Sequence, residues 1–233
     1  MKKCAILSVY FHQTPVGGSF IFHHPALEFF MKRMEFYNGQ YCHIYNRGVD
    51  KRIIFDDKND YQRFLKGMAV FNQINRKATC TLTRNNGYNK NTCRTKLVNI
   101  RCYCLMPNHF HILLQQNSDN GISHFFQRLG NGYTKYFNLK HKRTGRLFEG
   151  PYKIKQVTNE RQLIYLTKYI HCNPLKLINK PHTNWDQINQ FLRDYPWSSY
   201  ADFLNSSGAN NIVDPKWLDE EFMDQKSYQE FMK

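Results

Sequence analysis

The chain has 233 residues, 41% of them hydrophobic, and its 33 Lys and Arg against 18 Asp and Glu give a formal net charge of +15. This composition excludes a disordered tail, and no apolar run reaches the roughly 20 residues that cross a bilayer as a helix. A compact protein this basic is expected to meet a polyanion. Because no strongly amphipathic basic helix stands out, we favour nucleic acid over a membrane surface.

Hydrophobic periodicity and turn residues predict alternating strands and helices along the chain. Asn59 is a candidate N-cap for the first helix, and Asn159 with Gln162 resembles a capping box for the third. The expected strands are 41–47, 97–106, 109–116 and 151–157, the expected helices are 59–74, 121–141 and 158–174, and a polar loop or exposed hairpin is expected at 77–96.

The order β-α-β-β-α-β-α predicts an α+β fold, with a ferredoxin-like antiparallel sheet and helices packed on one face, in a single domain. This domain is expected to span residues 34–204. Residues 1–33 lack a clean period and are interpreted as a peripheral N-terminal extension that need not be native. Residues 205–233 are interpreted as a C-terminal tail. A signal peptide is not favoured, because no clear small-residue cleavage site follows the first apolar run.

Seven cysteines occur at irregular spacing, and none belongs to a CxxC pair. We interpret them as reduced cytosolic thiols rather than as disulfide partners. The lack of CxxC pairs also argues against a structural protein stabilised by zinc.

Two histidines, His109 and His111, stand two apart in the expected strand 109–116. Residues i and i+2 project from one face of a strand, so both imidazoles can reach one metal ion while Phe110 and Ile112 point to the opposite face. A His-x-His pair alone also fits two ordinary hydrogen-bonded histidines. The spacing therefore leaves both interpretations open.

Tyr169 and Asn173 are four apart in the expected helix 158–174 and share one face of it. A phenol beside a carboxamide could complete a site with the two histidines, since an amide oxygen suits a hard ion such as Mg²⁺ or Mn²⁺. Alternatively, Tyr169 is a core aromatic residue and Asn173 is a helix C-cap before Pro174.

Several segments together, in matching order, resemble one family. MPNHFHILL (106–114) resembles the histidine–hydrophobic–histidine motif of the HUH endonuclease superfamily, and YIHCNP (169–174) resembles the nucleophile segment of its single-tyrosine branch. Further segments are similar to blocks of the REP-associated tyrosine transposases, relatives of the single-tyrosine insertion-sequence transposases: NRG (46–48), GRLFEGPYK (145–153) and YPWSSY (195–200).

The resemblance implies a metal-dependent DNA endonuclease and strand transferase that nicks and rejoins single-stranded or hairpin DNA during transposition. Tyr169 would be the nucleophile and would form a 5′-phosphotyrosine link beside a free 3′-OH. His109, His111 and Asn173 would bind Mg²⁺ or Mn²⁺. Such an enzyme is expected in the cytoplasm, associated with the nucleoid and not with a membrane. A homodimer stays open, because dimers and monomers both occur among the relatives.

Other residues have supporting roles in this interpretation. His43 and Asn108 could support the site, and Glu149 could help to place the metal or pair with Arg146. Tyr133 and Tyr136 are alternative nucleophiles, although neither has a ligand-type residue four positions later. DNA contacts are expected, unless the charged stretch is simply a solvated face, from Arg47, Lys140, Lys142, Arg143, Arg146, Lys153 and Lys155.

The main alternative function is a catalytically inactive or domesticated DNA-binding regulator of the same fold. Such a protein would keep the basic surface and have no need for Tyr169. The complete set of His109, His111, Tyr169 and Asn173 argues for the enzyme.

Overall fold

The computed structural model describes residues 36–74, 96–178, 184–205, 212–213, 217 and 225–233. All of them belong to one compact unit, Phe36–Lys233. The expected N-terminal extension, 1–33, and the expected loop, 77–96 except its last residue, lie outside the described residues.

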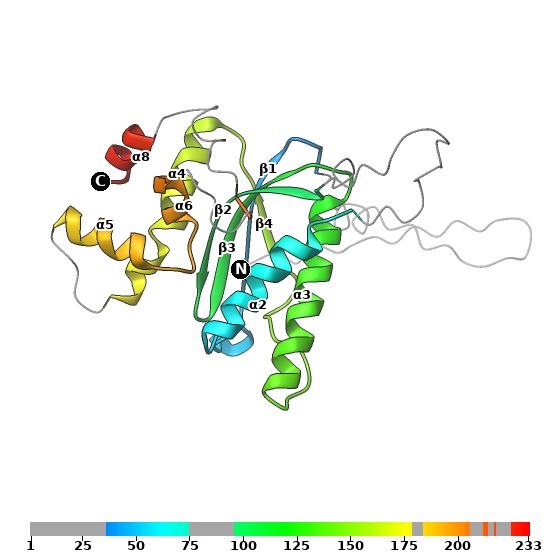
Figure 1. The fold of residues 1–233 in the computed structure, drawn as a ribbon. Coiled ribbons are helices and arrows are strands. Elements are labelled where there is room, and N and C mark those ends of the chain that lie inside the picture. Colours follow the sequence, from blue (N-terminus) through cyan, green and yellow to red (C-terminus); the bar gives the residue numbers. More distant parts are fainter. Residues whose placement is uncertain (1–35, 75–95, 179–183, 206–211, 214–216, 218–224) are drawn as a thin grey trace, which may run out of the picture. The chain divides into compact units, whose positions relative to one another are not determined.

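A four-stranded antiparallel sheet with the order β2-β3-β1-β4 forms the centre of the fold (Figure 1). Its strands are β1 (Tyr41–Arg47), β2 (Val98–Met106), β3 (His109–Gln116) and β4 (Lys153–Gln156). The helix α2 (Lys58–Phe71) connects β1 to β2, after a short 3-10 turn η1 (Val49–Lys51), and α3 (Gly121–Lys140) connects β3 to β4. This is the β-α-β-β-α-β path of ferredoxin-like folds, so the predicted α+β class is confirmed.

The helices α2 and α3 pack side by side over one face of the sheet (Figure 1). Phe110 of β3 contacts Phe64 of α2 and Phe126 of α3, with ring centroids 5.2 and 6.3 Å apart. Gly132 allows the two helices to approach closely, because a Cβ there would lie 2.9 Å from the ring of Phe71. A glycine that weakens α3 as an isolated helix therefore has a packing role.

The start of α2 differs from the sequence prediction, which chose Asn59 as the cap. Asp57 is the N-cap, and its carboxylate accepts hydrogen bonds from the backbone N–H groups of Asn59 and Asp60 at 2.9 and 3.1 Å. The side chain of Asp60 accepts from the N–H of Asp57 in return, which completes a capping box. A reciprocal pair satisfies more of the free N–H groups than Asn59 alone could.

The helix α4 (Glu160–His171) covers the opposite face of the sheet, so helices pack on both faces and not only on the predicted one (Figure 1). That face also carries buried apolar side chains, Cys102 and Leu113, which a helix must shield from water. Asn159 caps α4 as predicted and accepts from the N–H of Gln162 at 2.8 Å. The 3-10 turn η2 (Asn173–Leu177) follows α4.

The described part of the expected tail, 205–233, contributes to the core. Trp217 is buried and donates from Nε1 to the carbonyl of Arg101, and the buried Tyr228 lies with its hydroxyl 2.8 Å from His171 Nδ1. The compact unit therefore continues beyond residue 204. The remaining helices are α5 (Trp185–Asp194), α6 (Tyr200–Asn205) and α8 (Gln225–Met232).

No helix in the described ranges combines the length and the apolar character that crossing a membrane requires.

Candidate active site

His109 and His111 project from the face of β3 that α4 covers. The register of the sheet pairs His109 with Met106 of β2 and His111 with Tyr45 of β1. The two imidazole rings lie 5.2 Å apart, nearly perpendicular to each other, while Phe110 between them packs on the other face. The predicted sharing of one face is therefore present.

Asn108 fixes the orientation of His109. Its Oδ1 lies 2.7 Å from His109 Nδ1, and its Nδ2 donates to the carbonyl of Lys51 at 3.2 Å. Because the amide oxygen can only accept, His109 Nδ1 carries the proton and Nε2 keeps its lone pair. Asn108 therefore favours the tautomer of His109 in which Nε2 has the lone pair.

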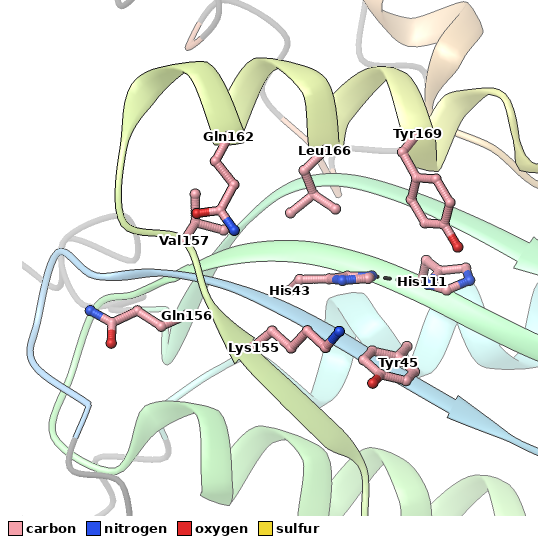
Figure 2. Close-up of a pocket in the computed structure, with 9 residues that line it drawn as sticks. All are labelled: His43, Tyr45, His111, Lys155, Gln156, Val157, Gln162, Leu166 and Tyr169. Carbon is pink, nitrogen blue, oxygen red and sulfur yellow. Dashed lines mark hydrogen bonds between the residues drawn. The ribbon is translucent and has the colours of Figure 1, made fainter.

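A third histidine, His43 of β1, is hydrogen-bonded to His111. Its Nε2 lies 2.9 Å from His111 Nδ1, and the rings are stacked with centroids 5.1 Å apart (Figure 2). One of these nitrogens donates and the other accepts. When His111 is the donor, its Nε2 is left with a free lone pair.

Tyr169 reaches the same histidines from α4. Its ring meets His111 edge-on at 5.4 Å and His43 at 6.3 Å, and its hydroxyl points toward the sheet beside His111 (Figure 2). The side chain is 45% exposed, so it is not the core aromatic residue of the alternative interpretation. The phenol is accessible and lies next to the imidazole pair.

Asn173 follows one turn after Tyr169, at the start of η2, and is almost completely buried. Its Nδ2 donates to the carbonyl of Tyr169 at 2.8 Å, so it does act as a cap for the end of α4. Its Oδ1 accepts from Lys176 Nζ at 2.9 Å, and the same ammonium lies 5.0 Å from the centre of the Tyr169 ring. The cap bond thus turns the amide oxygen toward the side that carries Lys176.

All three imidazoles have lowered pKa values. Burial, with Lys155 nearby, lowers the pKa of His43 to about 4. Burial and the charges of Lys176 and Arg47 lower the pKa of His109 to about 4, although a hydrogen bond with Asn173 acts in the opposite direction. Burial and the neighbouring His43, His109 and Lys176 lower the pKa of His111 to about 3. The rings are therefore neutral at pH 7, the form that ligates metals.

The donors that surround this point fit a divalent cation. Two neutral imidazoles and one amide oxygen can serve as nitrogen and oxygen ligands. Among the described residues, no group of three or more His, Cys, Asp or Glu side chains is arranged for a metal, so a third ligand has to be of another type, as Asn173 is. Lys176 would compete with a bound cation for the oxygen of Asn173.

A cavity of about 390 Å³ lies between the sheet and α4 (Figure 2). It runs from Tyr169 and His111 toward the first turn of α4. The residues that line it are His43, Tyr45, His111, Lys155, Gln156, Val157, Gln162, Leu166 and Tyr169.

Part of the chain matches a known protein family. Residues 59–173 match the family described as "Transposase IS200 like". Through this segment the chain is similar to the IS200-like transposases. The segment begins in α2 and ends at Asn173, so it contains His109, His111 and Tyr169 but not β1 with His43.

One solved structure is also similar: "Structure of the REP associates tyrosine transposase bound to a REP hairpin". The similarity has a TM-score of 0.48 with 14% sequence identity, and it covers 73% of this chain and 81% of that chain. No curated protein matches the chain.

The alternative nucleophiles of the IS200-like segment lie away from the histidines. Tyr133 is buried between α3 and α2 and donates its hydroxyl hydrogen bond to the carbonyl of Ile54 at 2.5 Å, and burial raises its pKa strongly. Tyr136 donates to Asp60 Oδ1 at 3.0 Å. Both belong to the helix pair on the opposite face of the sheet, so the structure brings only Tyr169 of these three to the imidazoles.

Three of the expected DNA-contacting residues lie around the histidines. Arg47 pairs in register with His109, and its buried Nε has no hydrogen-bond partner within the described residues. Lys155 lines the cavity, and Lys153 Nζ lies 6.0 Å from the ring centre of Tyr45. Glu149 forms an ion pair with Lys153 at 3.7 Å and not with Arg146, the partner considered from the sequence.

The other expected contacts follow the end of α3. Lys140 is held by two carboxylates, Asp60 at 2.7 Å and Asp57 at 2.9 Å, so its charge is already compensated. Arg143 donates to Asn138 Oδ1 and to the carbonyl of Arg146. Lys142 and Arg146 are exposed. These residues at the end of α3 are therefore weaker candidates for phosphate contacts near Tyr169 than Arg47, Lys153 and Lys155 are.

Sequence reasoning missed Lys176, Gln162 and Tyr45 as components of the site. Lys176 stands three residues after Asn173, and side chains three apart lie above one another in a 3-10 turn such as η2. Tyr45 is two residues after His43 on one strand face. From the sequence alone, Gln162 has a role only in the helix cap.

Proposed function

We propose that this protein cleaves and rejoins single-stranded or hairpin DNA through a covalent 5′-phosphotyrosine at Tyr169, as a transposase. The observation that carries the proposal is the position of the exposed Tyr169 phenol, whose ring lies 5.4 Å from His111. The match of residues 59–173 to the IS200-like transposase family supports a DNA substrate. The net charge of +15 supports it too.

In the cleavage step the Tyr169 oxygen attacks the phosphorus of a DNA phosphodiester. The P–O3′ bond breaks as the P–O(Tyr) bond forms, the phenol loses its proton, and the departing 3′ oxygen gains one. Rejoining is the reverse attack by a 3′-OH on the phosphotyrosine. The covalent link stores the phosphodiester energy, so no nucleotide cofactor is consumed.

His109, His111 and Asn173 are the residues that would hold a divalent cation, Mg²⁺ or Mn²⁺. When bound, the cation supplies Lewis-acid polarisation of the scissile phosphate and offsets its developing negative charge. Asn108 holds His109 in the tautomer with a free Nε2. His43 Nε2, 2.9 Å from His111 Nδ1, would accept the Nδ1–H of His111 in the tautomer that leaves His111 Nε2 free.

Arg47, Lys153 and Lys155 would bind phosphates on either side of the cleaved bond. Such contacts position DNA without reading its sequence and make the affinity depend steeply on salt. A protein that acts in this way on DNA is expected in the cytoplasm, on the nucleoid.

Tyr169→Phe tests the proposal, with Tyr165→Phe on the same helix as the matched control. Each protein is incubated with Mg²⁺ or Mn²⁺ and a library of single-stranded hairpins that are labelled at the 3′ or at the 5′ end. A 5′-phosphotyrosine leaves the 3′-labelled fragment attached to the protein and releases the 5′-labelled fragment.

Tyr169→Phe should lose the adduct completely and keep its DNA affinity, while Tyr165→Phe should form the adduct normally. Cleavage by Tyr169→Phe at the wild-type rate would remove Tyr169 from the mechanism. Binding without any cleavage by the wild type would instead favour the DNA-binding regulator.

A further inference from the structure

The cavity beside Tyr169 extends beyond the residues that the proposed reaction uses. One end is formed by Tyr169, His43 and His111. The other end lies under the first turn of α4 and is lined by Gln162, Leu166, Val157 and Gln156. A volume of about 390 Å³ is within the range of sites that enclose a small organic ligand, about 300–1,000 Å³.

Gln162 presents a hydrogen-bond donor with a fixed direction at this far end. Its Oε1 accepts from the N–H of Thr158 at 2.9 Å and from the Thr158 hydroxyl at 3.2 Å. The NH₂ group of the amide therefore turns toward the cavity (Figure 2). Gln162 is an exposed residue, so this donor is open to solvent and within reach of a ligand in the cavity.

An apolar segment separates that donor from the nucleophile. Gln162, Leu166 and Tyr169 follow one another along the same side of α4, and Leu166 points into the cavity between the other two (Figure 2). Val157 adds a second apolar side chain. A flat ring with polar edges fits such a surface better than a sugar or a free ion does, because its face is apolar and its edge carries acceptors.

Lys155 gives the middle of the cavity a positive charge. Its ammonium group points toward Tyr45 and His43, and it contributes to the lowered pKa of His43 (Figure 2). No carboxylate of the described residues forms an ion pair with it, unlike Lys153 and Lys140. An anionic group on the ligand would supply the missing partner.

We propose that this cavity receives one unpaired nucleotide next to the scissile phosphate, with its base against Leu166 and an acceptor on the base edge bonded to Gln162 Nε2. Its phosphate lies beside Lys155. The inference rests on the proposed function, which brings a DNA strand to Tyr169. From Gln162 to Tyr169 the helix rises about 10 Å, enough to hold a base edge at one end and a phosphate at the other.

The test compares strands that carry bases with a strand that does not. Short oligo-dT, oligo-dA and oligo-dC and an abasic strand of equal length are titrated with the full-length protein in EDTA, and binding is followed by fluorescence anisotropy. The readout is the ratio of the affinities for a base-bearing strand and the abasic strand. General electrostatic effects cancel in this ratio, because all the strands carry the same charge.

The wild-type protein should prefer at least one base-bearing strand by about tenfold. Gln162→Glu keeps the acceptor that Thr158 needs, removes the donor and adds one negative charge, so the helix cap survives while the ratio falls several-fold toward one. Leu166→Ala should lower the ratio as well. Gln127→Glu, which adds the same charge at an exposed position of α3, should leave the ratio unchanged.

A wild-type ratio of one would overturn the proposal, and so would a ratio that Gln162→Glu and Leu166→Ala leave unchanged. Neither result depends on cleavage, since metal is absent. Failure of the nucleotide site is therefore distinguishable from failure of Tyr169 as the nucleophile, which the adduct assay reports separately.

Discussion

His43 Nε2 and His111 Nδ1 lie 2.9 Å apart and join two neighbouring strands through their imidazoles. The bond decides which nitrogen of His111 faces the cavity with a lone pair. A ligating histidine usually donates its other ring N–H to a partner that orients it, and loss of such a partner typically costs 10–100-fold in metal affinity.

His43→Phe should therefore weaken Mn²⁺ binding by about 10-fold or more, because His111 loses its acceptor. His43→Gln should retain more affinity, since its amide oxygen can accept the same hydrogen bond. Titration of Mn²⁺ followed by electron paramagnetic resonance measures the affinity directly, without DNA. His124→Gln, at an exposed position of α3, is the control. Equal affinity in all of these variants would show that His43 does not orient a ligand.

Lys176 should oppose metal binding, since its ammonium donates to Asn173 Oδ1 and its charge lowers the pKa of His109 and His111. Lys176→Met frees the amide oxygen and removes a positive charge near the metal site. We expect the Mn²⁺ affinity to rise about fivefold, because the repulsion that is removed amounts to about 1 kcal/mol at a partly solvated site. Lys176→Arg keeps the charge and should change the affinity little. The same titration tests both variants, and weaker binding by Lys176→Met would contradict the expectation.

His171 should make stability depend on pH. It is fully buried between the hydroxyls of Tyr228 and Ser199, and burial lowers its pKa to about 3. In the unfolded chain its pKa is about 6.5, so below that pH the unfolded state binds a proton that the folded state rejects. The free energy of unfolding therefore falls as the pH drops from about 6.5 toward 4, and this contribution is fully present above 6.5.

Urea unfolding across this pH range, in EDTA, measures that contribution. His171→Gln cannot titrate, so its pH slope should be smaller by up to about 1.4 kcal/mol per pH unit. His43, His109 and His111 act in the same direction and remain in the variant, which should keep a residual slope. Parallel curves for the variant and the wild type would exclude a neutral, buried His171.

The helix α2 allows a direct test of its observed cap. Asp57→Ala removes the carboxylate that accepts from Asn59 and Asp60, and it should lower the free energy of unfolding by about 1 kcal/mol. Asn59→Ala, at the position that the sequence favoured, should cost clearly less. Chemical denaturation at pH 7 compares the two, and a larger loss for Asn59→Ala would contradict the assignment of Asp57 as the cap.

Local patterns in the sequence contain most of the fold and part of the site. Alternating apolar and polar residues predict β1 and β3, and apolar residues at a 3.6-residue period predict α4. Both patterns repeat within a few residues, so the sequence alone reveals them. The shared face of His109 and His111 follows from the same alternation. The sequence does not predict that Asp57 rather than Asn59 is the N-cap of α2, because both residue types can cap a helix. The hydrogen bond from the Asp57 N–H to the Asp60 side chain, which completes the capping box, distinguishes them.

Local patterns do not determine which face of the sheet a helix covers. Both faces carry buried apolar side chains, so α4 had to be placed by the packing of the whole unit. The same is true of the C-terminal segment, whose Trp217 and Tyr228 find their partners in β2 and α4 only after folding.

By itself the sequence determined the elements, their order, the histidine pair on one strand face and the tyrosine with its neighbouring amide on one helix. Only the tertiary structure decided that α4 lies over that strand face, that His43 binds His111, that Lys176 reaches Asn173 and that Gln162 points into a cavity. The physical reason is the difference in sequence separation between the residues that interact. Periodicity and caps act between residues a few positions apart, whereas these contacts depend on strand order and register, which bring together residues far apart in the chain.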